Sequence, residues 1–390
     1  MKRVARHDGP TLAVSIGCPS GIGPEVSFAG ALALAKRRRD VRVILVGDAG
    51  ALRAVAGSSL IEERDFSAEL ADGTRKSAVQ RVPGRWSMFL ARGTKVLVFQ
   101  PTKVLAAKDR TPGKPSRAGG AAQLAWIDAA TDLVTNGIAD ALVTGPVSKD
   151  AIARSGARGA RAFRGHTEHL AARLQAREVT MAFWTEKLTT SLVTTHLPLA
   201  KVPRAIKREE VARATYWTAR FVTALGRSPP PLAIAALNPH AGERGLLGKE
   251  EDETISPGID LARRRLAKDH IAIELTGPVP AESAFRRAAN GDFSGVVAMY
   301  HDQATIPMKL LGFGEAVNVS LGLPIIRTSV DHGTAYDRAG KGTADPRGMI
   351  EAMTLALRLE REERRERARS AASEAAGSRR VSLRGEAPRY

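Results

Sequence analysis

The sequence predicts an α/β fold with a largely parallel sheet, divided into two domains. Short apolar runs that read as strands alternate with longer helical stretches along the chain. The chain has 390 residues, of which 43% are hydrophobic, so it is long for one domain and can bury a large core. Alternation of strands with helices is typical of proteins in which helices cover a mostly parallel sheet.

The predicted elements follow this pattern without an internal repeat. Buried strands are expected at Thr11–Ile16, Val41–Val46, Lys95–Gln100, Ala139–Thr144, Thr190–Thr194, Leu232–Leu237, Val296–Met299 and Ala316–Val319. Helices are expected between them, for example at Gly120–Asn136, Glu209–Leu225 and Glu251–Lys268. Loops or insertions are expected at Glu62–Trp86, which is polar, and at Thr111–Gly120, which is rich in Gly, Pro and Ser.

The C-terminal residues 361–390 carry many charges but almost no large apolar side chains. They cannot bury enough surface to offset the entropy lost on ordering. We therefore expect a frayed helix end followed by a disordered tail.

Composition argues against several classes of protein. No stretch approaches the roughly 20 uninterrupted apolar residues that span a bilayer, and no apolar segment follows the basic start MKRVARHDGP, so we expect a cytoplasmic protein. Cys18 is the single cysteine, which excludes an intramolecular disulfide and a cysteine-based zinc site. The formal net charge of +18 comes largely from scattered arginine clusters without interleaved aromatic residues, so we expect an anionic small substrate rather than nucleic acid.

The first candidate segment, Gly17–Val26, directly follows a predicted strand. Its glycines allow a tight turn, Pro24 suits the first turn of a helix, and Glu25 complements the helix dipole. The segment could hold an anion at the helix N-terminus, or be a plain strand-to-helix turn. It is not a Rossmann fingerprint, because Val26 occupies the third glycine position, and no Gly-Lys-Ser/Thr follows as in a P-loop.

Four further residues adjoin loops at the ends of predicted elements. Lys149 follows a predicted strand, where ligands of open α/β sheets bind, and could meet a phosphate or carboxylate or stay solvated. His166, His240 and His301 are far apart in the sequence. Three imidazoles with an open coordination position suit Zn²⁺ or a similar divalent ion, although each could instead be a packed or surface histidine.

Polar residues interrupt the apolar pattern between residues 309 and 335. Lys309, Asn318 and Arg327 would be costly inside a plain core, and arginine offers a bidentate fork for phosphate or carboxylate. The Gly-rich loop Tyr336–Pro346 follows ahead of a helix and contains a carboxylate that could accept hydrogen bonds from a ribose.

These blocks resemble the family of 4-hydroxythreonine-4-phosphate dehydrogenases, often called PdxA. The likeness runs from about Thr11 to Leu359 and is carried by GHTEHL, LNPHAGE, MYHDQ and IRTSVDHGTA. HGTAYDRAGKGTADP is also similar to the adenosine-binding loop of isocitrate and isopropylmalate dehydrogenases. The resemblance implies two α/β/α domains with mostly parallel sheets and the active site in the cleft between them. Residues 1–139 and 300–360 would form the first domain, residues 140–299 the central one, and residues 361–390 the tail.

The resemblance also implies roles for individual residues. A divalent metal (Zn²⁺, Mg²⁺ or Co²⁺) would be held by His166, His240 and His301, and the phosphorylated substrate by Lys309, Asn318 and Arg327. NAD would contact His332, Gly333, Thr334, Asp337 and Gly340, with the carboxylate of Asp337 disfavouring the 2′-phosphate of NADP. The candidates for proton transfer are Asp302, Lys309 and Lys149. Family members are homodimers, and we expect the same here.

The implied reaction is NAD-dependent oxidation of 4-phosphohydroxy-L-threonine in vitamin B6 synthesis. The product is a β-keto acid, which loses CO₂ to give 3-amino-2-oxopropyl phosphate. The first family block usually reads Gly-Asp-Pro-Ala-Gly, whereas here Cys18 replaces the acid and Ser20 the small residue. Substrates of other relatives, namely D-threonate or D-erythronate 4-phosphate and cyclic dihydrodiols, therefore stay open, with a non-catalytic anion- or nucleic-acid-binding protein as a distant alternative.

Overall fold

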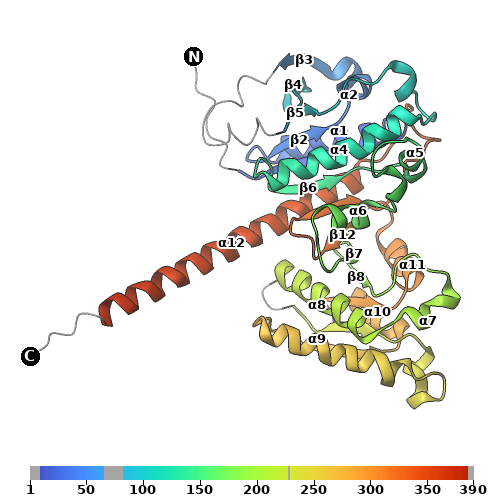
Figure 1. The fold of residues 1–390 in the computed structure, drawn as a ribbon, viewed down its shortest axis with the longest axis vertical. Coiled ribbons are helices and arrows are strands. Elements are labelled where there is room, and N and C mark those ends of the chain that lie inside the picture. Colours follow the sequence, from blue (N-terminus) through green and yellow to red (C-terminus); the bar gives the residue numbers. More distant parts are fainter. Residues whose placement is uncertain (1–8, 66–81, 227–228, 385–390) are drawn as a thin grey trace, which may run out of the picture.

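A single mixed sheet runs the length of the molecule (Figure 1). The structure, a computed structural model, describes residues 9–65, 82–226 and 229–384. The strand order is β10-β9-β11-β8-β7-β12-β13-β6-β1-β2-β5-β4-β3. The strands are β1 Thr11–Ser15, β2 Arg42–Val46, β3 Leu60–Asp65, β4 Arg85–Ala91, β5 Thr94–Gln100, β6 Ala141–Thr144, β7 Thr180–Trp184, β8 Thr189–Leu192, β9 Leu232–Ala235, β10 Leu275–Val279, β11 Gly295–Ala298, β12 Val317–Leu321 and β13 Arg327–Val330.

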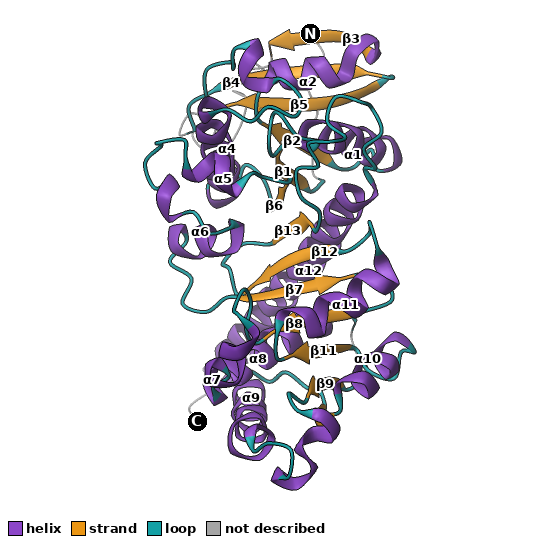
Figure 2. Cartoon of the chain, turned by 90° about the vertical axis from the view of Figure 1, so that its right-hand side faces the viewer, coloured by secondary structure: helices purple, strands orange, loops and turns teal. Residues whose placement is uncertain are grey.

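Helices cover both faces of this sheet (Figure 2). They are α1 Gly23–Arg37, α2 Ala49–Ala56, α4 Arg117–Thr135, α5 Lys149–Ala153, α6 His166–Arg173, α7 Val202–Ala205, α8 Arg208–Leu225, α9 Ser256–Lys268, α10 Ala281–Ala289, α11 His301–Gly312 and α12 Arg347–Arg384. Side-chain hydrogen bonds cap the N-termini of two of them. The Asp48 carboxylate caps α2 by accepting from the Ala51 amide, and the Ser116 hydroxyl caps α4 by accepting from the Gly119 amide.

The predicted α/β class is confirmed, and each of the eight predicted strands overlaps an observed one. The sheet contains two parallel blocks, β10-β9-β11-β8 and β13-β6-β1-β2-β5. Antiparallel pairings of β7 and β12 join the blocks into one continuous sheet. The predicted domain boundaries stay a prediction, and β6, expected in the central domain, pairs with β1 of the other part.

Two predictions for irregular segments differ from the structure. The segment Glu62–Trp86 was expected to be a loop, but its ends belong to β3 and β4, while residues 66–81 lie outside the described residues. The predicted disordered tail is instead helical to Arg384, because α12 continues away from the body (Figure 1). Local helix propensity and i,i+4 ion pairs such as Arg367–Glu363, 2.7 Å, favour a helix without tertiary burial. Residues 385–390 lie outside the described part.

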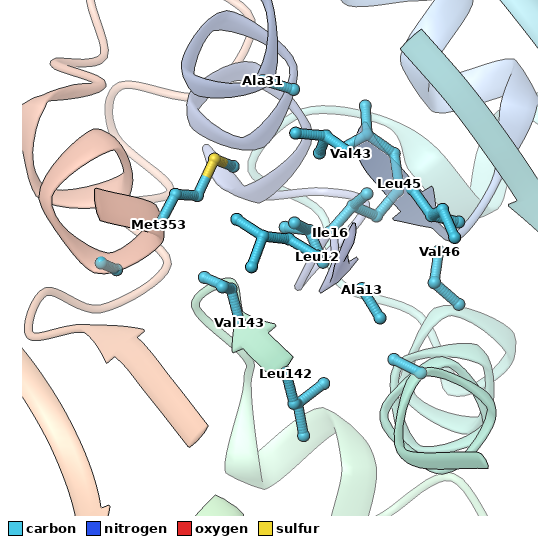
Figure 3. Packing of buried hydrophobic residues seen from close by; sticks show 14 of the residues in the cluster. Leu12, Ala13, Ile16, Ala31, Val43, Leu45, Val46, Leu142, Val143 and Met353 are labelled. Atoms are coloured by element: carbon cyan, nitrogen blue, oxygen red, sulfur yellow. The ribbon is translucent and has the colours of Figure 1, made fainter. Parts of the chain in front are cut away.

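The core behind the site joins β1, β2, β6 and the start of α12. Leu12 and Val143 point toward Met353 of α12, whereas Leu142 points to the other side of β6, and all four side chains are fully buried (Figure 3). This packing anchors the beginning of α12, which directly follows the Gly-rich loop predicted to bind the cofactor. In the described residues, none of the helices has the length and apolar character required to cross a membrane.

Candidate active site

Three predicted site residues are the first residues of helices. Lys149 begins α5, His166 begins α6 and His301 begins α11. The free amides at a helix N-terminus carry partial positive charge, which favours an anion nearby. The arrangement therefore already suits a negatively charged substrate before any side chain is considered.

Arg327 is the most informative side chain of the site, because it is a cation only 2% exposed. Its Nη1 donates to Asn318 Oδ1 (2.8 Å) and Ser320 Oγ (3.0 Å), and its Nη2 donates to Thr144 Oγ1 (2.6 Å). Its buried Nε has no hydrogen-bond partner, and among the described residues no carboxylate forms an ion pair with it. Burial lowers the pKa of Arg327 to about 9, partly offset by the charge of Glu168. Such a cation requires an anionic partner, which a ligand can supply.

His166 lies beside this guanidinium. Burial, followed by the charges of Arg327, His169 and Lys149, lowers the pKa of His166 well below its ordinary value. The ring is therefore neutral at neutral pH, and its buried Nε2 has no hydrogen-bond partner. A hydrogen bond of 2.9 Å between Thr167 Oγ1 and Ser320 Oγ ties α6 to β12 and fixes the ring near Arg327.

His196, which the sequence prediction missed, pairs with His301. The two ring centroids are 5.5 Å apart. Burial, followed by the charges of Lys149 and His301, lowers the pKa of His196. Lys149 is therefore an electrostatic neighbour of both His196 and His166. The signal was present, since His196 follows a predicted strand just as the three chosen histidines adjoin element ends.

Asp331 is a second residue that the prediction missed. Burial raises the pKa of Asp331, while the charges of Lys309, His332 and His301 partly oppose this shift. These four residues are thus electrostatic neighbours, although Lys309 itself is exposed. The carboxylate of Asp302, a predicted proton-transfer candidate, accepts a hydrogen bond of 2.7 Å from His301 Nδ1, which leaves Nε2 of that ring without a proton and available to a ligand.

His240 stands on an unusual turn. Residues 240–244 all have positive φ, a conformation that costs L-residues about 1–2 kcal/mol each. The buried carboxylate of Glu251, which the prediction also missed, accepts hydrogen bonds from the amides of Leu237 (2.9 Å) and Asn238 (2.8 Å) and holds the start of this turn. His240 itself is exposed.

The predicted metal ligands fit only in part. A neutral imidazole with an unpartnered nitrogen, as in His166, is chemically a possible ligand. However, no group of three His, Cys, Asp or Glu side chains able to hold a metal forms within the described ranges of one chain. The structure brings His301 to His196, and His240 is on a separate loop.

The predicted cofactor loop packs on the first candidate segment. The amide of Gly340 donates to Glu25 Oε1 at 2.6 Å, and the amide of Ile22 donates to the carbonyl of Thr334 at 2.9 Å. The exposed Asp337 and Gly333 lie on the same loop, and His332 Nδ1 is 3.0 Å from the Gly333 carbonyl. A cavity of about 520 Å³ borders this loop, with a lining that includes Pro24, Glu25, Val55, Arg110, Pro112 and Gly340.

The chain is similar to known proteins over most of its length. A family model described as pyridoxal phosphate biosynthetic protein PdxA matches residues 39–356. A 4-hydroxythreonine-4-phosphate dehydrogenase from Desulfosudis oleivorans is 41% identical over 89% of this chain and 95% of its own length. The enzyme of that name from Methylorubrum populi is 40% identical over 91% and 96%, respectively.

Solved structures show the same likeness. The crystal structure of a 4-hydroxythreonine-4-phosphate dehydrogenase from Klebsiella pneumoniae has a TM-score of 0.70 and 32% identity, and covers 90% of this chain and 100% of its own. A terephthalate 1,2-cis-dihydrodiol dehydrogenase from Burkholderia xenovorans is more distant, with a TM-score of 0.58, 28% identity, and coverage of 90% and 98%.

Proposed function

Because the chain belongs to the PdxA family of pyridoxal phosphate biosynthetic proteins, we propose that it oxidises 4-phosphohydroxy-L-threonine with NAD. The 3-hydroxyl becomes a ketone, and the resulting β-keto acid loses CO₂ to give 3-amino-2-oxopropyl phosphate. The observation that carries the proposal is the buried, unpaired guanidinium of Arg327 beside the neutral ring of His166. A phosphate or carboxylate supplies the missing counter-charge and accepts from both.

The remaining cations suit the second anionic group of this substrate. Lys149 lies close enough to His196 to lower the pKa of that ring, and Lys309 close enough to Asp331 to oppose the rise of the pKa of that carboxyl. Phosphate at one end and carboxylate at the other would fix the reacting carbon between them, which lowers the entropy cost of reaching the transition state. We assign the substrate phosphate to the guanidinium of Arg327 together with Asn318. Lys149 and Lys309 would orient the substrate carboxylate.

Proton transfer needs a group near the 3-hydroxyl. Asp302, Lys309 and Lys149 are the candidates from the sequence, and we add Asp331, whose burial raises the pKa of its carboxyl. A base with a pKa closer to neutrality accepts and returns protons more readily at neutral pH. In the reaction the proton goes to such a group, and the hydride goes to the nicotinamide.

We propose that the divalent metal uses His196, His240 and His301, with His166 assigned to the substrate. The 5.5 Å approach of the His196 and His301 rings supports the change from the set expected from the sequence. When bound, the metal supplies a Lewis acid for the hydroxyl and the ketone. The described residues of one chain do not bring three such ligands together.

The cofactor assignment rests on the loop that precedes α12. We propose that NAD binds along His332–Gly340, with the adenosine near the cavity beside Gly340. A carboxylate at Asp337 would repel a 2′-phosphate, which favours NAD over NADP. By likeness to the family, we propose a homodimer that works in the cytoplasm.

The alternative substrate, a four-carbon sugar-acid phosphate, differs chiefly in lacking the ammonium group. Carboxylates at Glu168 and Asp331 lie next to the cationic pocket and can accept from an ammonium, which favours the amino acid substrate. We expect kcat/KM for 4-phosphohydroxy-L-threonine to exceed that for D-erythronate 4-phosphate by at least about 100-fold in initial NADH formation. If kcat/KM for D-erythronate 4-phosphate is equal or greater, the four-carbon sugar-acid phosphate is the substrate instead.

A further inference from the structure

The first candidate segment contacts the cofactor loop through hydrogen bonds to Thr334 and Gly340, which we together call the clamp. The Ile22 amide at the start of α1 is occupied by the Thr334 carbonyl, at 2.9 Å. A Cβ atom at Gly21 would lie only 2.6 Å from the same carbonyl, so glycine permits this close approach. At the other end of the loop, the Gly340 amide donates to Glu25. Two hydrogen bonds thus hold the loop to residues 17–25.

Between these two points the Tyr336 side chain enters a polar notch. Its hydroxyl is 3.5 Å from Cys18 Sγ, and the Ser148 and Thr334 side chains lie close enough to lower the pKa of this phenol. Ser148 precedes Lys149, and the amide of Cys18 donates to the Pro146 carbonyl at 2.8 Å. The Tyr336 phenol therefore connects the cofactor loop to Cys18, whose own amide is bound to the segment just before Lys149.

We propose that Tyr336 and Cys18 are positioning residues that set the affinity for NAD by holding the cofactor loop in its binding geometry. The proposal deepens the proposed function and rests on the assignment of NAD to this loop. It also gives a role to Cys18, which stands where the resembling family usually has an acid.

Burial makes this contact a neutral one. It raises the pKa of Tyr336 to about 12 and also raises the pKa of the Cys18 thiol. Both groups therefore keep their protons at neutral pH, and the phenol can donate while neighbouring hydroxyls adjust around it. Residue 18 is only 1% exposed, so a carboxylate there would be a buried charge. The neutral Cys18 thiol beside the neutral Tyr336 phenol avoids this cost.

The test compares Tyr336→Phe and Cys18→Ala with the double variant. We expect each single change to raise the Kd of NAD, measured by calorimetry, about threefold to tenfold, which is the effect of one lost buried hydrogen bond. The double variant should show less than the product of the two effects, because both changes remove the same contact. KM for NAD should rise more than kcat falls.

Hydrogen exchange of the free protein tests the clamp without NAD. The amides of Arg338, Gly340 and Lys341 are hydrogen-bonded within or onto the loop, and should exchange faster in both variants. Tyr216→Phe is the matched control, since the hydroxyl of this buried tyrosine on α8 hydrogen-bonds Asp269, which follows α9, and not the loop. It should change neither loop exchange nor the Kd of NAD.

The two readouts separate the possible failures. Unchanged loop exchange and unchanged NAD affinity in Tyr336→Phe would overturn the clamp. Fully multiplicative effects in the double variant would overturn the pairing of Tyr336 with Cys18. Absence of NAD binding by the unaltered protein, with faster loop exchange in both variants, would support the clamp and remove NAD from the proposed function.

Discussion

Replacement of Arg327 by Met is expected to lower kcat/KM about 100- to 1,000-fold without loss of stability. The activity falls because a charge-assisted contact to the substrate anion is worth about 3–4 kcal/mol in a buried site. The fold survives because the guanidinium is buried among neutral partners, Asn318, Ser320 and Thr144, and a buried charge without a counter-ion does not stabilise the free protein. Initial rates with varied substrate, and urea unfolding of the same samples, measure the two quantities.

The control is an arginine that does have a carboxylate partner. Arg265 on α9 donates to both oxygens of Glu178, at 2.7 and 3.1 Å, outside the site. Arg265→Met should lower the free energy of unfolding by up to about 1 kcal/mol and leave kcat/KM unchanged. If Arg327→Met instead unfolds the protein and Arg327→Lys retains full kcat/KM, Arg327 is a structural cation and the anion pocket is misplaced.

The second large effect distinguishes His196 from His166. His196→Ala is expected to lose bound metal after dialysis and to reduce turnover by at least about 100-fold, because a ligand beside His301 is removed. His240→Ala should behave in the same way, with the fold intact. His166→Ala should keep the metal and raise KM for the phosphorylated substrate, because its unpartnered Nε2 faces the Arg327 pocket. Metal content by mass spectrometry and steady-state kinetics supply the comparison.

A histidine outside the site provides the reference for this series. His270 follows α9 with a φ of 56°, a conformation that asparagine tolerates, so His270→Asn should preserve metal content and kinetics. Loss of metal from His166→Ala together with retention by His196→Ala would restore the ligand set expected from the sequence and refute the exchange of roles.

Local patterns in the sequence predicted the regular parts of the fold. Apolar runs such as Val41–Val46 coincide with strands, because buried strands of a parallel sheet are apolar on both faces. The strand β13 was not predicted, because it begins with Arg327 and a charged residue interrupts the apolar pattern by which the other strands were recognised. Low burial alone predicted disorder after Glu360, whereas i,i+4 pairs of Arg with Glu favour the helical extension of α12 without burial.

The site was predictable residue by residue but not as an arrangement. Thr144 and Arg327 are 183 residues apart, and only the pairing of β6 with β13 makes their side chains neighbours. Spacing along the chain likewise does not reveal that His196 approaches His301. Cys18 could be recognised as unusual from the sequence, whereas its contact with Tyr336 becomes visible only when the first segment packs on the cofactor loop.

The most direct test of the central claim is simultaneous measurement of NADH and CO₂ from 4-phosphohydroxy-L-threonine, NAD and a divalent cation, with and without a chelator. We predict that both products form in equal amounts, that the chelator abolishes both, and that added metal restores them. If folded, metal-supplied protein binds NAD but forms neither NADH nor CO₂, the assigned substrate is contradicted. NADH formed without CO₂ would contradict the decarboxylating reaction, whereas absence of both products would direct attention to the sugar-acid phosphates and dihydrodiols.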